Sequence, residues 1–73
     1  MKDIDVKKVL QLADKYYFEK DYKKAKKYYE ISANKGDSYS MCVIGIMYED
    51  GEGVIQNCKT AIYWYKLAAL SGS

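Results

Sequence analysis

Residues 40–72 read SMCVIGIMYEDGEGVIQNCKTAIYWYKLAALSG, and this stretch decides the fold because the first half of the chain shares its pattern. A shift of thirty-six residues places small residues over small, aromatic over aromatic and Gly over Gly: Ala25, Tyr28, Tyr29, Ala33 and Gly36 fall on Ala61, Trp64, Tyr65, Ala69 and Gly72. A shift of thirty-two places Leu12, Ala13 and Tyr16 on Ile44, Gly45 and Tyr48. The shifts differ by four residues, so the second unit contains an insertion, which we assign to residues 50–53.

Each of the two units has the spacing of two amphipathic helices. In the first unit Val6, Val9, Ala13 and Tyr16 recur at intervals of three or four residues, and a second series starts at Tyr22. This periodicity predicts helices over residues 4–19, 22–35, 38–49 and 58–71.

The expected helix boundaries carry chemical markers. Asp21, Asp37 and Asn57 can accept hydrogen bonds from the free N–H groups at a helix start. Gly36 and Gly72 stand where a left-handed residue commonly ends a helix. We therefore predict an all-α fold of two antiparallel helix hairpins, stacked as a short α-solenoid. The hairpins, residues 1–36 and 37–73, together form one domain.

The composition agrees with helices and argues against several functional classes. The 73 residues contain no proline, five glycines and 49% apolar residues, which fits neither a turn-rich β-sandwich nor long disorder. All twelve basic residues are lysines, so the guanidinium that reads guanine is missing and specific nucleic-acid binding is disfavoured. The first ten residues carry five charges and no apolar run, so we expect no membrane span and a cytoplasmic location.

Small residues mark the places where helices approach closely. Ala13 and Gly45 are predicted to be such contacts, paired with Ala25 and Ala61. The aromatic residues expected to fill the space between successive hairpins are Tyr28, Tyr29, Trp64 and Tyr65. The positions to which we assign a structural role in the repeat are Ala13, Tyr16, Ala25, Tyr28, Ala33, Gly36, Gly45, Tyr48, Gly51, Gly53, Ala61, Trp64, Tyr65, Ala68, Ala69 and Gly72.

The pattern of residues 40–72 closely resembles a Sel-one-like repeat. The small position, Tyr, Gly-x-Gly-Val, Ala, Trp-Tyr, Ala-Ala and final Gly all match, with mild departures at Ser40, Ile44, Ile55 and Asn57, where Ala, Leu, Pro and Asp are usual. The first unit lacks the Gly-x-Gly-Val insertion and is more similar to a plain tetratricopeptide repeat. The resemblance implies a right-handed superhelix that acts as a non-enzymatic adaptor without a cofactor, holding a peptide or protein partner on its concave face.

Helical geometry divides the first helix of each hairpin into two stripes. The stripe predicted to pack into the core consists of Val9, Leu12, Ala13, Tyr16, Met41, Ile44, Gly45 and Tyr48. In tetratricopeptide-like arrays the other stripe lines the concave groove, so the resemblance makes its members our candidates for partner binding: Lys7, Leu10, Asp14, Tyr17, Tyr39, Cys42, Ile46 and Glu49. The alternative is that some of these residues merely cover the core of a two-repeat stub.

The charged motifs have ordinary explanations. The lysine run at residues 23–27 could attract phosphate or anionic lipid, but pairing of Lys26 and Lys27 with Glu30 favours a solvated helix face. The Gly-Glu-Gly run at residues 51–53 lacks the Lys and the Ser or Thr of a phosphate-binding loop. The acids Glu49, Asp50 and Glu52 lack the alternation of a calcium loop, so we predict no metal site.

The two cysteines, Cys42 and Cys58, are expected to be reduced, buried or half-buried thiols that lie too far apart to form a disulfide. A thiol at a helix start such as Cys58 could be reactive. The chain has no His to act as its base, so we predict that the protein is not an enzyme.

Two functional hypotheses stay open, an interaction scaffold and a structural assembly subunit. Repeat stacks usually need three or more units, and the last helix of this chain would expose Ile62, Tyr65 and Ala69. A basic first half and an acidic second half could let copies stack head to tail, in an assembly that salt would weaken. A third possibility is that the chain is a fragment of a longer array.

Overall fold

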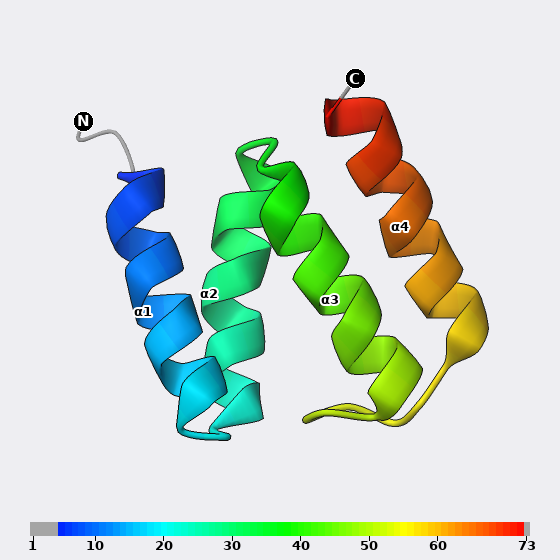
Figure 1. Cartoon of the computed structure of the whole chain (residues 1–73), viewed down its shortest axis with the longest axis horizontal. Helices are drawn as coiled ribbons and strands as arrows, with labels where there is room; N and C mark the ends of the chain where they lie inside the picture. The colour runs from blue at the N-terminus through cyan, green and yellow to red at the C-terminus, as the bar shows by residue number, and fades with distance from the viewer. Residues whose placement is uncertain (1–4, 73) are drawn as a thin grey trace.

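The computed structural model describes residues 5–72 and has four helices that lie side by side in chain order, each antiparallel to the next (Figure 1). The helices are α1 Val6–Phe18, α2 Tyr22–Asn34, α3 Ser38–Asp50 and α4 Cys58–Gly72. Helix α1 packs on α2 and α3 packs on α4 as two hairpins, which meet where α2 contacts α3. No strand occurs in residues 5–72, so the predicted all-α stack of two hairpins is confirmed.

Side-chain caps start all four helices at the positions that local chemistry favours. Asp21, Asp37 and Asn57 each accept the N–H of the residue three positions later, at 3.4, 2.8 and 3.1 Å, as predicted. Asp5 caps α1 in the same way, accepting the N–H groups of Lys7 and Lys8. Helix α1 therefore begins after Asp5, and the predicted start at residue 4 lies outside the described residues.

Residues with a positive φ angle follow three of the helices, and at α1 this residue is Lys20, with a φ of 62°. Gly36 and Gly51 have positive φ angles of 93° and 72°, which places them at the ends of α2 and α3. The prediction for Gly72 is wrong, because this residue is the last helical residue of α4. A Cβ on Gly72 would lie 3.3 Å from Ser38 Oγ, so the glycine lets the end of α4 approach the start of α3.

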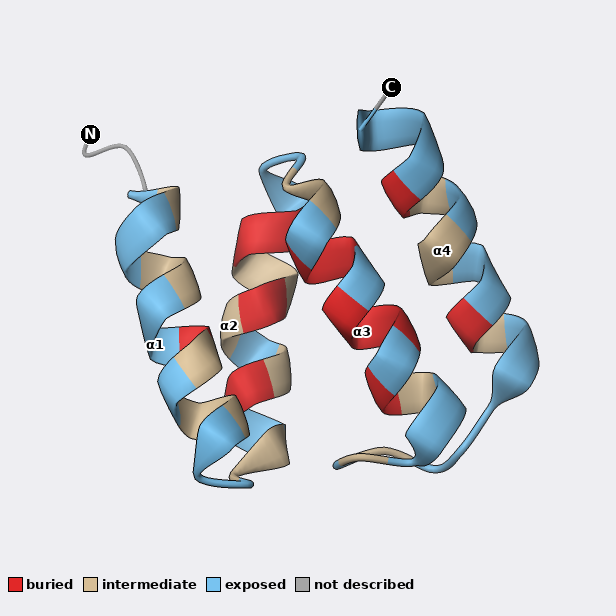
Figure 2. Cartoon of the chain, viewed as in Figure 1, coloured by how far each residue is buried: buried red, intermediate tan, exposed pale blue. Residues whose placement is uncertain are grey.

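The hydrophobic core lies along the two middle helices (Figure 2). Most buried residues belong to α2 and α3, whereas α1 buries Ala13 and α4 buries Ala61 and Ala68. Leu12 was predicted to pack but is 40% exposed, while its equivalent Ile44 is fully buried. Helix α3 has a neighbour on both sides and α1 has a neighbour on one side only, so the face that carries Leu12 meets solvent.

The same difference between inner and outer helices explains Ala69, to which we assigned a structural role. Ala69 is exposed, although its equivalent Ala33 in α2 is buried. Helix α3 covers the face of α2 that carries Ala33, and nothing in residues 5–72 covers the corresponding face of α4.

None of the helices in this part of the chain combines the length and hydrophobicity needed to cross a membrane.

Tyr28 and Tyr65 lie within their own hairpins, so the prediction that both rings separate the hairpins is wrong. Tyr28 stacks on Tyr16 of α1 with ring centroids 5.7 Å apart. The ring of Tyr65 lies over Gly45, where a Cβ would come within 2.6 Å of Cε1. The missing side chain of Gly45 thus creates the space for an aromatic ring between α3 and α4.

Tyr29 does lie between the hairpins. It is 1% exposed and makes an edge-to-face contact with Tyr39 of α3, with ring centroids 6.3 Å apart. Trp64 belongs to α4, the last helix, where it is half-buried against the core and makes an edge-to-face contact with Tyr63. Of the four aromatic residues predicted to fill the inter-hairpin space, Tyr29 is the one that joins α2 to α3.

Candidate partner-binding groove

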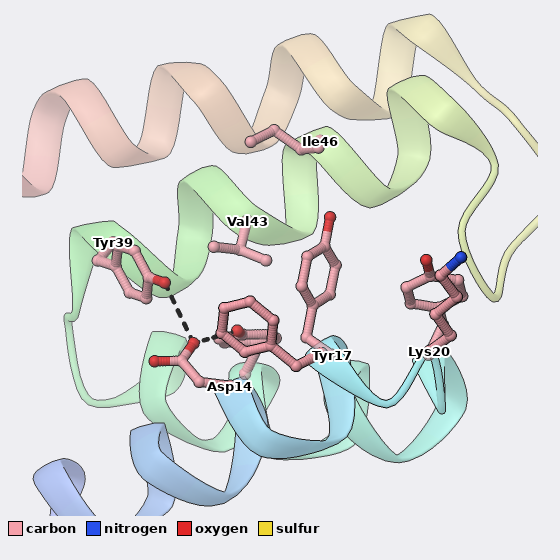
Figure 3. Close-up of a pocket in the computed structure, with 9 residues that line it drawn as sticks. Asp14, Tyr17, Lys20, Tyr39, Val43 and Ile46 are labelled. Atoms are coloured by element: carbon pink, nitrogen blue, oxygen red, sulfur yellow. Dashed lines mark hydrogen bonds between the residues drawn. The ribbon is translucent and has the colours of Figure 1, made fainter.

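A groove of about 460 Å³ lies between the first helices of the two hairpins, and Figure 3 shows its side chains. Helix α1 and the turn after it form one side, α3 forms the other, and α2 contributes residues between them. We call this cavity the inter-hairpin groove, and its lining residues are Asp14, Tyr17, Phe18, Lys20, Tyr22, Tyr29, Tyr39, Val43 and Ile46.

Four of the eight candidate binding residues line this groove, namely Asp14, Tyr17, Tyr39 and Ile46. The other four do not. Glu49 borders a smaller cavity of about 250 Å³ between α3 and α4, Leu10 packs against the core, and Lys7 and Cys42 are exposed outside both cavities. The groove therefore uses half of the predicted stripe, from the second half of α1 and from α3.

Sequence reasoning missed the groove residues Phe18, Lys20, Tyr22, Tyr29 and Val43. Two of them belong to α2, which was treated as a packing helix, and two follow the predicted stripe at the end of α1. Their proximity to α3 depends on the angle between the hairpins, which residue spacing within one helix does not specify.

One end of the groove is organised by the carboxylate of Asp14. Its Oδ1 accepts hydrogen bonds from the phenol groups of Tyr29 and Tyr39, the second at 3.1 Å, so one side chain joins α1, α2 and α3 (Figure 3). Burial, followed by this hydrogen bond, raises the pKa of Tyr29 above its ordinary value, and the pKa of Tyr39 is raised by the same two causes in the same order. Both phenols are therefore neutral donors at neutral pH.

A second carboxylate reaches the groove from the insertion between α3 and α4. Tyr17 donates a hydrogen bond of 2.7 Å from its hydroxyl to Glu52 Oε1. Backbone bonds from Glu52 to Met47 and from Asn57 to Tyr48, at 2.8 and 2.9 Å, hold this loop against the end of α3. Burial, and then Glu52, raises the pKa of Tyr17.

The same loop also touches the first hairpin directly. A Cβ on Gly53 would lie 2.6 Å from Cβ of Tyr22 and 3.1 Å from its carbonyl carbon, so only glycine fits there. Tyr22 in turn makes an edge-to-face contact with Tyr17, at a centroid distance of 5.4 Å. The four-residue insertion thus fixes one end of the groove by contacting the start of α2.

The sequence contains two Sel1 repeats, matched by the Sel1 repeat family model at residues 10–37 and 38–73. The chain belongs to the Sel1 repeat family. A segment of 53 residues, 73% of the chain, is 42% identical to DAP3-binding cell death enhancer 1 of Rattus norvegicus. It covers 10% of that protein, so the chain spans about a tenth of this relative's length. Sel1 repeats are generally protein-interaction modules.

The lysine-rich face of the first Sel1 repeat lies away from the groove. Lys23, Lys24 and Lys27 are exposed, and Lys26 forms the predicted ion pair with Glu30 at 2.8 Å. The structure therefore agrees with a solvated helix face. Among residues 5–72 no group of three His, Cys, Asp or Glu side chains could hold a metal ion.

Both thiols of this Sel1 chain are exposed, so the prediction that they are buried or half-buried is wrong. Cys42 lies on a face of α3 that points away from the core, while its neighbours Met41 and Val43 are buried. Cys58 is the first residue of α4, at the end of the loop. The two are free cysteines, as expected.

Proposed function

We propose that this chain holds an extended segment of a protein partner in the inter-hairpin groove. The proposal rests on a groove with a mostly apolar lining that contains the carboxylate of Asp14, and on a second carboxylate, Glu52, that accepts a hydrogen bond from the lining residue Tyr17. Apolar rings supply contact area at little entropic cost, and a few fixed polar groups orient a ligand.

A rigid wall of tyrosines supports the same proposal. Tyr17 lies edge-to-face against both Tyr22 and Tyr29, at 5.4 and 6.2 Å, and Tyr29 lies against Tyr39. These contacts connect α1, α2 and α3 before any ligand arrives, so binding would require little rearrangement of the wall.

The rat relative supports the class of partner. Its name describes a protein that binds DAP3, and the similarity extends over part of it. For the present chain we propose that the partner is a protein, and that it binds through an extended segment that fits the mostly apolar lining of the groove. The cytoplasmic location stays a prediction.

The test is selection from a library of random peptides, followed by affinity measurement on two matched variants. Ile46→Asn changes an isoleucine that lines the groove and is 39% exposed. Ile62→Asn changes an isoleucine on α4 that is 51% exposed and lines the smaller cavity between α3 and α4. We expect the selected peptides to lose affinity for Ile46→Asn and to keep it for Ile62→Asn. Equal affinity for both variants would rule out the groove as their site.

A second candidate, self-association, has its own observation. Ile62, Tyr63 and Leu70 on α4 are 51, 58 and 76% exposed, so the last helix presents large apolar side chains to solvent. The charges differ from the head-to-tail pattern that the two halves of the sequence indicated. The ionic residues of α4 are Lys59 and Lys66, whereas the acids of the second half lie at the ends of α3 and in the loop.

Stacking of α4 on the exposed face of α1 would bring these lysines near Lys8 and Lys15, which flank Leu12. Association through this face should therefore persist or strengthen as salt screens like charges. Light scattering at low and moderate salt distinguishes association through the apolar residues of α4 from association through opposite charges. Assembly that salt dissolves would contradict the apolar contact, and a monomer at all concentrations would remove this candidate.

A further inference from the structure

The groove, taken together with the loop carboxylate bonded to it, has a charge opposite in sign to the rest of the molecule. The chain carries a net charge of +2. The lining contains the carboxylate of Asp14 and the ammonium of Lys20, and Glu52, which lies outside the lining, adds a second carboxylate through its hydrogen bond from Tyr17. The numerous lysines of the chain lie on other surfaces, among them the exposed side of α2.

Both carboxylates are held in place by neutral donors, so their charge is not cancelled. Tyr29 and Tyr39 donate to Oδ1 of Asp14, and Tyr17 donates to Oε1 of Glu52. An ionised carboxylate has about four acceptor positions, which leaves room on each for an N–H group of a ligand. A ligand's ammonium or guanidinium would thus meet a fixed anion, without the entropy cost of ordering a mobile one.

The electrostatics of the lining tyrosines agree with this geometry. After burial and the hydrogen bond to Glu52, the charges of Glu52, Tyr22 and Asp50 raise the pKa of Tyr17. The charges of Asp14 and Tyr39 act in the same direction on the pKa of Tyr29. Carboxylates therefore act on the tyrosines of the lining both near Asp14 and near Glu52.

We propose, on the basis of the groove-binding function above, that the partner segment is a basic, hydrophobic peptide. Its Lys or Arg side chains flank aliphatic or aromatic residues, with the cations near Asp14 and Glu52 and the apolar residues against Val43 and Ile46. Carboxylates that meet the cations of a bound peptide fix the peptide's register and speed its association more than they add affinity. Lys20 is the residue of the lining that opposes such a peptide.

The probe set is three peptides of one design, acetyl-Gly-X-Leu-Phe-X-Gly-amide, in which X is Lys, Gln or Glu. Affinity is measured by fluorescence anisotropy on the full chain at low and moderate salt. We expect the Lys peptide to bind roughly two- to five-fold more tightly than the Gln peptide, and the Glu peptide to bind least. Moderate salt should reduce the difference. Equal or tighter binding of the Gln or Glu peptide would overturn the proposal.

Variants of opposite expected sign sharpen the test. Asp14→Asn and Glu52→Gln keep an oxygen that can accept from tyrosine, and each should weaken the Lys peptide roughly two- to five-fold. Lys20→Asn should strengthen it, and Asn tolerates the positive φ of 62° at this position. Glu30→Gln, a carboxylate outside the groove, should leave the affinity unchanged. Circular dichroism verifies that each variant is folded.

The outcomes separate this inference from the proposed function. If the Lys and Gln peptides bind equally and both are lost with Ile46→Asn, the groove binds peptides and the basic preference is wrong. If the Lys peptide binds but neither Ile46→Asn nor Asp14→Asn affects it, the groove is not its site and both proposals fail for this ligand.

Discussion

The contact of Gly53 with Tyr22 can be tested with an unusually close internal control. Gly51 and Gly53 lie two residues apart in one loop, and their φ angles are 72° and 73°. A Cβ on Gly51 would meet nothing nearer than 3.4 Å, whereas a Cβ on Gly53 would lie 2.6 Å from Cβ of Tyr22. Substitution by alanine therefore imposes similar backbone strain at both positions and a steric clash at Gly53 alone.

The expected magnitudes follow from these two terms. A left-handed conformation costs a residue with a Cβ about 1–2 kcal/mol, and this applies to both variants. At Gly53 the clash includes the carbonyl carbon of Tyr22 at 3.1 Å, so backbone must move, which adds about 1–3 kcal/mol. The smaller entropy of the unfolded alanine chain enters both variants equally and cancels in the comparison. Gly53→Ala should therefore be less stable than Gly51→Ala by about 1–3 kcal/mol.

Urea unfolding followed by circular dichroism measures the free energy of unfolding of both variants. If Gly53→Ala is unfolded in buffer, a titration with trimethylamine oxide restores a measurable transition. Amide hydrogen exchange adds a local readout, since release of the loop should reduce protection near Glu52 in Gly53→Ala only. Equal free energies for the two variants would refute the claim that the insertion fastens the second hairpin to the first.

Three further predictions concern the core and the tyrosines. Ser32 is buried and its hydroxyl has no hydrogen-bond partner among the described residues, so Ser32→Ala should raise the free energy of unfolding by about 1 kcal/mol. Ser40→Ala removes a 2.7 Å hydrogen bond to Asp37, the cap of α3, and should lower the free energy of unfolding by about 1 kcal/mol in the same urea experiment. Gly45→Ala should destabilise the protein by about 1–2 kcal/mol because the added Cβ displaces the ring of Tyr65. In a double-mutant cycle, Tyr65→Leu should reduce the cost of Gly45→Ala, whereas strictly additive changes would show that the two residues do not interact. Burial and carboxylate contacts raise the pKa of Tyr65 from 10.0 to about 12, and they also raise the pKa of Tyr29. The stability that these two tyrosines contribute should therefore be complete below pH 10 and decrease as pH rises toward their folded pKa values, at up to about 1.4 kcal/mol per pH unit for the buried Tyr29. A free energy of unfolding that does not fall as pH rises above 10 would contradict this.

The parts of the fold that depend on neighbours along the chain could be predicted from the sequence. The caps Asp21, Asp37 and Asn57 act within three residues, and the helical periodicity located the four helices to within about two residues at their ends. The prediction for Gly72 failed because its role is a contact with Ser38 on another helix.

The groove was predictable in part for the same reason. The stripe on α1 and α3 supplied Asp14, Tyr17, Tyr39 and Ile46, because helix geometry fixes which residues share a face. Glu52 and Tyr29 were not identified, since the first acts through a folded-back loop and the second through the packing of α2 on α3. The exposure of Leu12 likewise reflects the end position of α1, which local patterning does not encode.

Nuclear magnetic resonance can test, residue by residue, whether the inter-hairpin groove binds a basic, hydrophobic segment. The labelled chain is titrated with the Lys form of the peptide probe, and the amide shifts are mapped on the structure. We expect saturable shifts at Asp14, Tyr17, Tyr39 and Ile46, and none at the exposed Ile62 and Tyr63 of α4. Shifts confined to α4, or no saturable shift within the groove, would contradict binding in the groove.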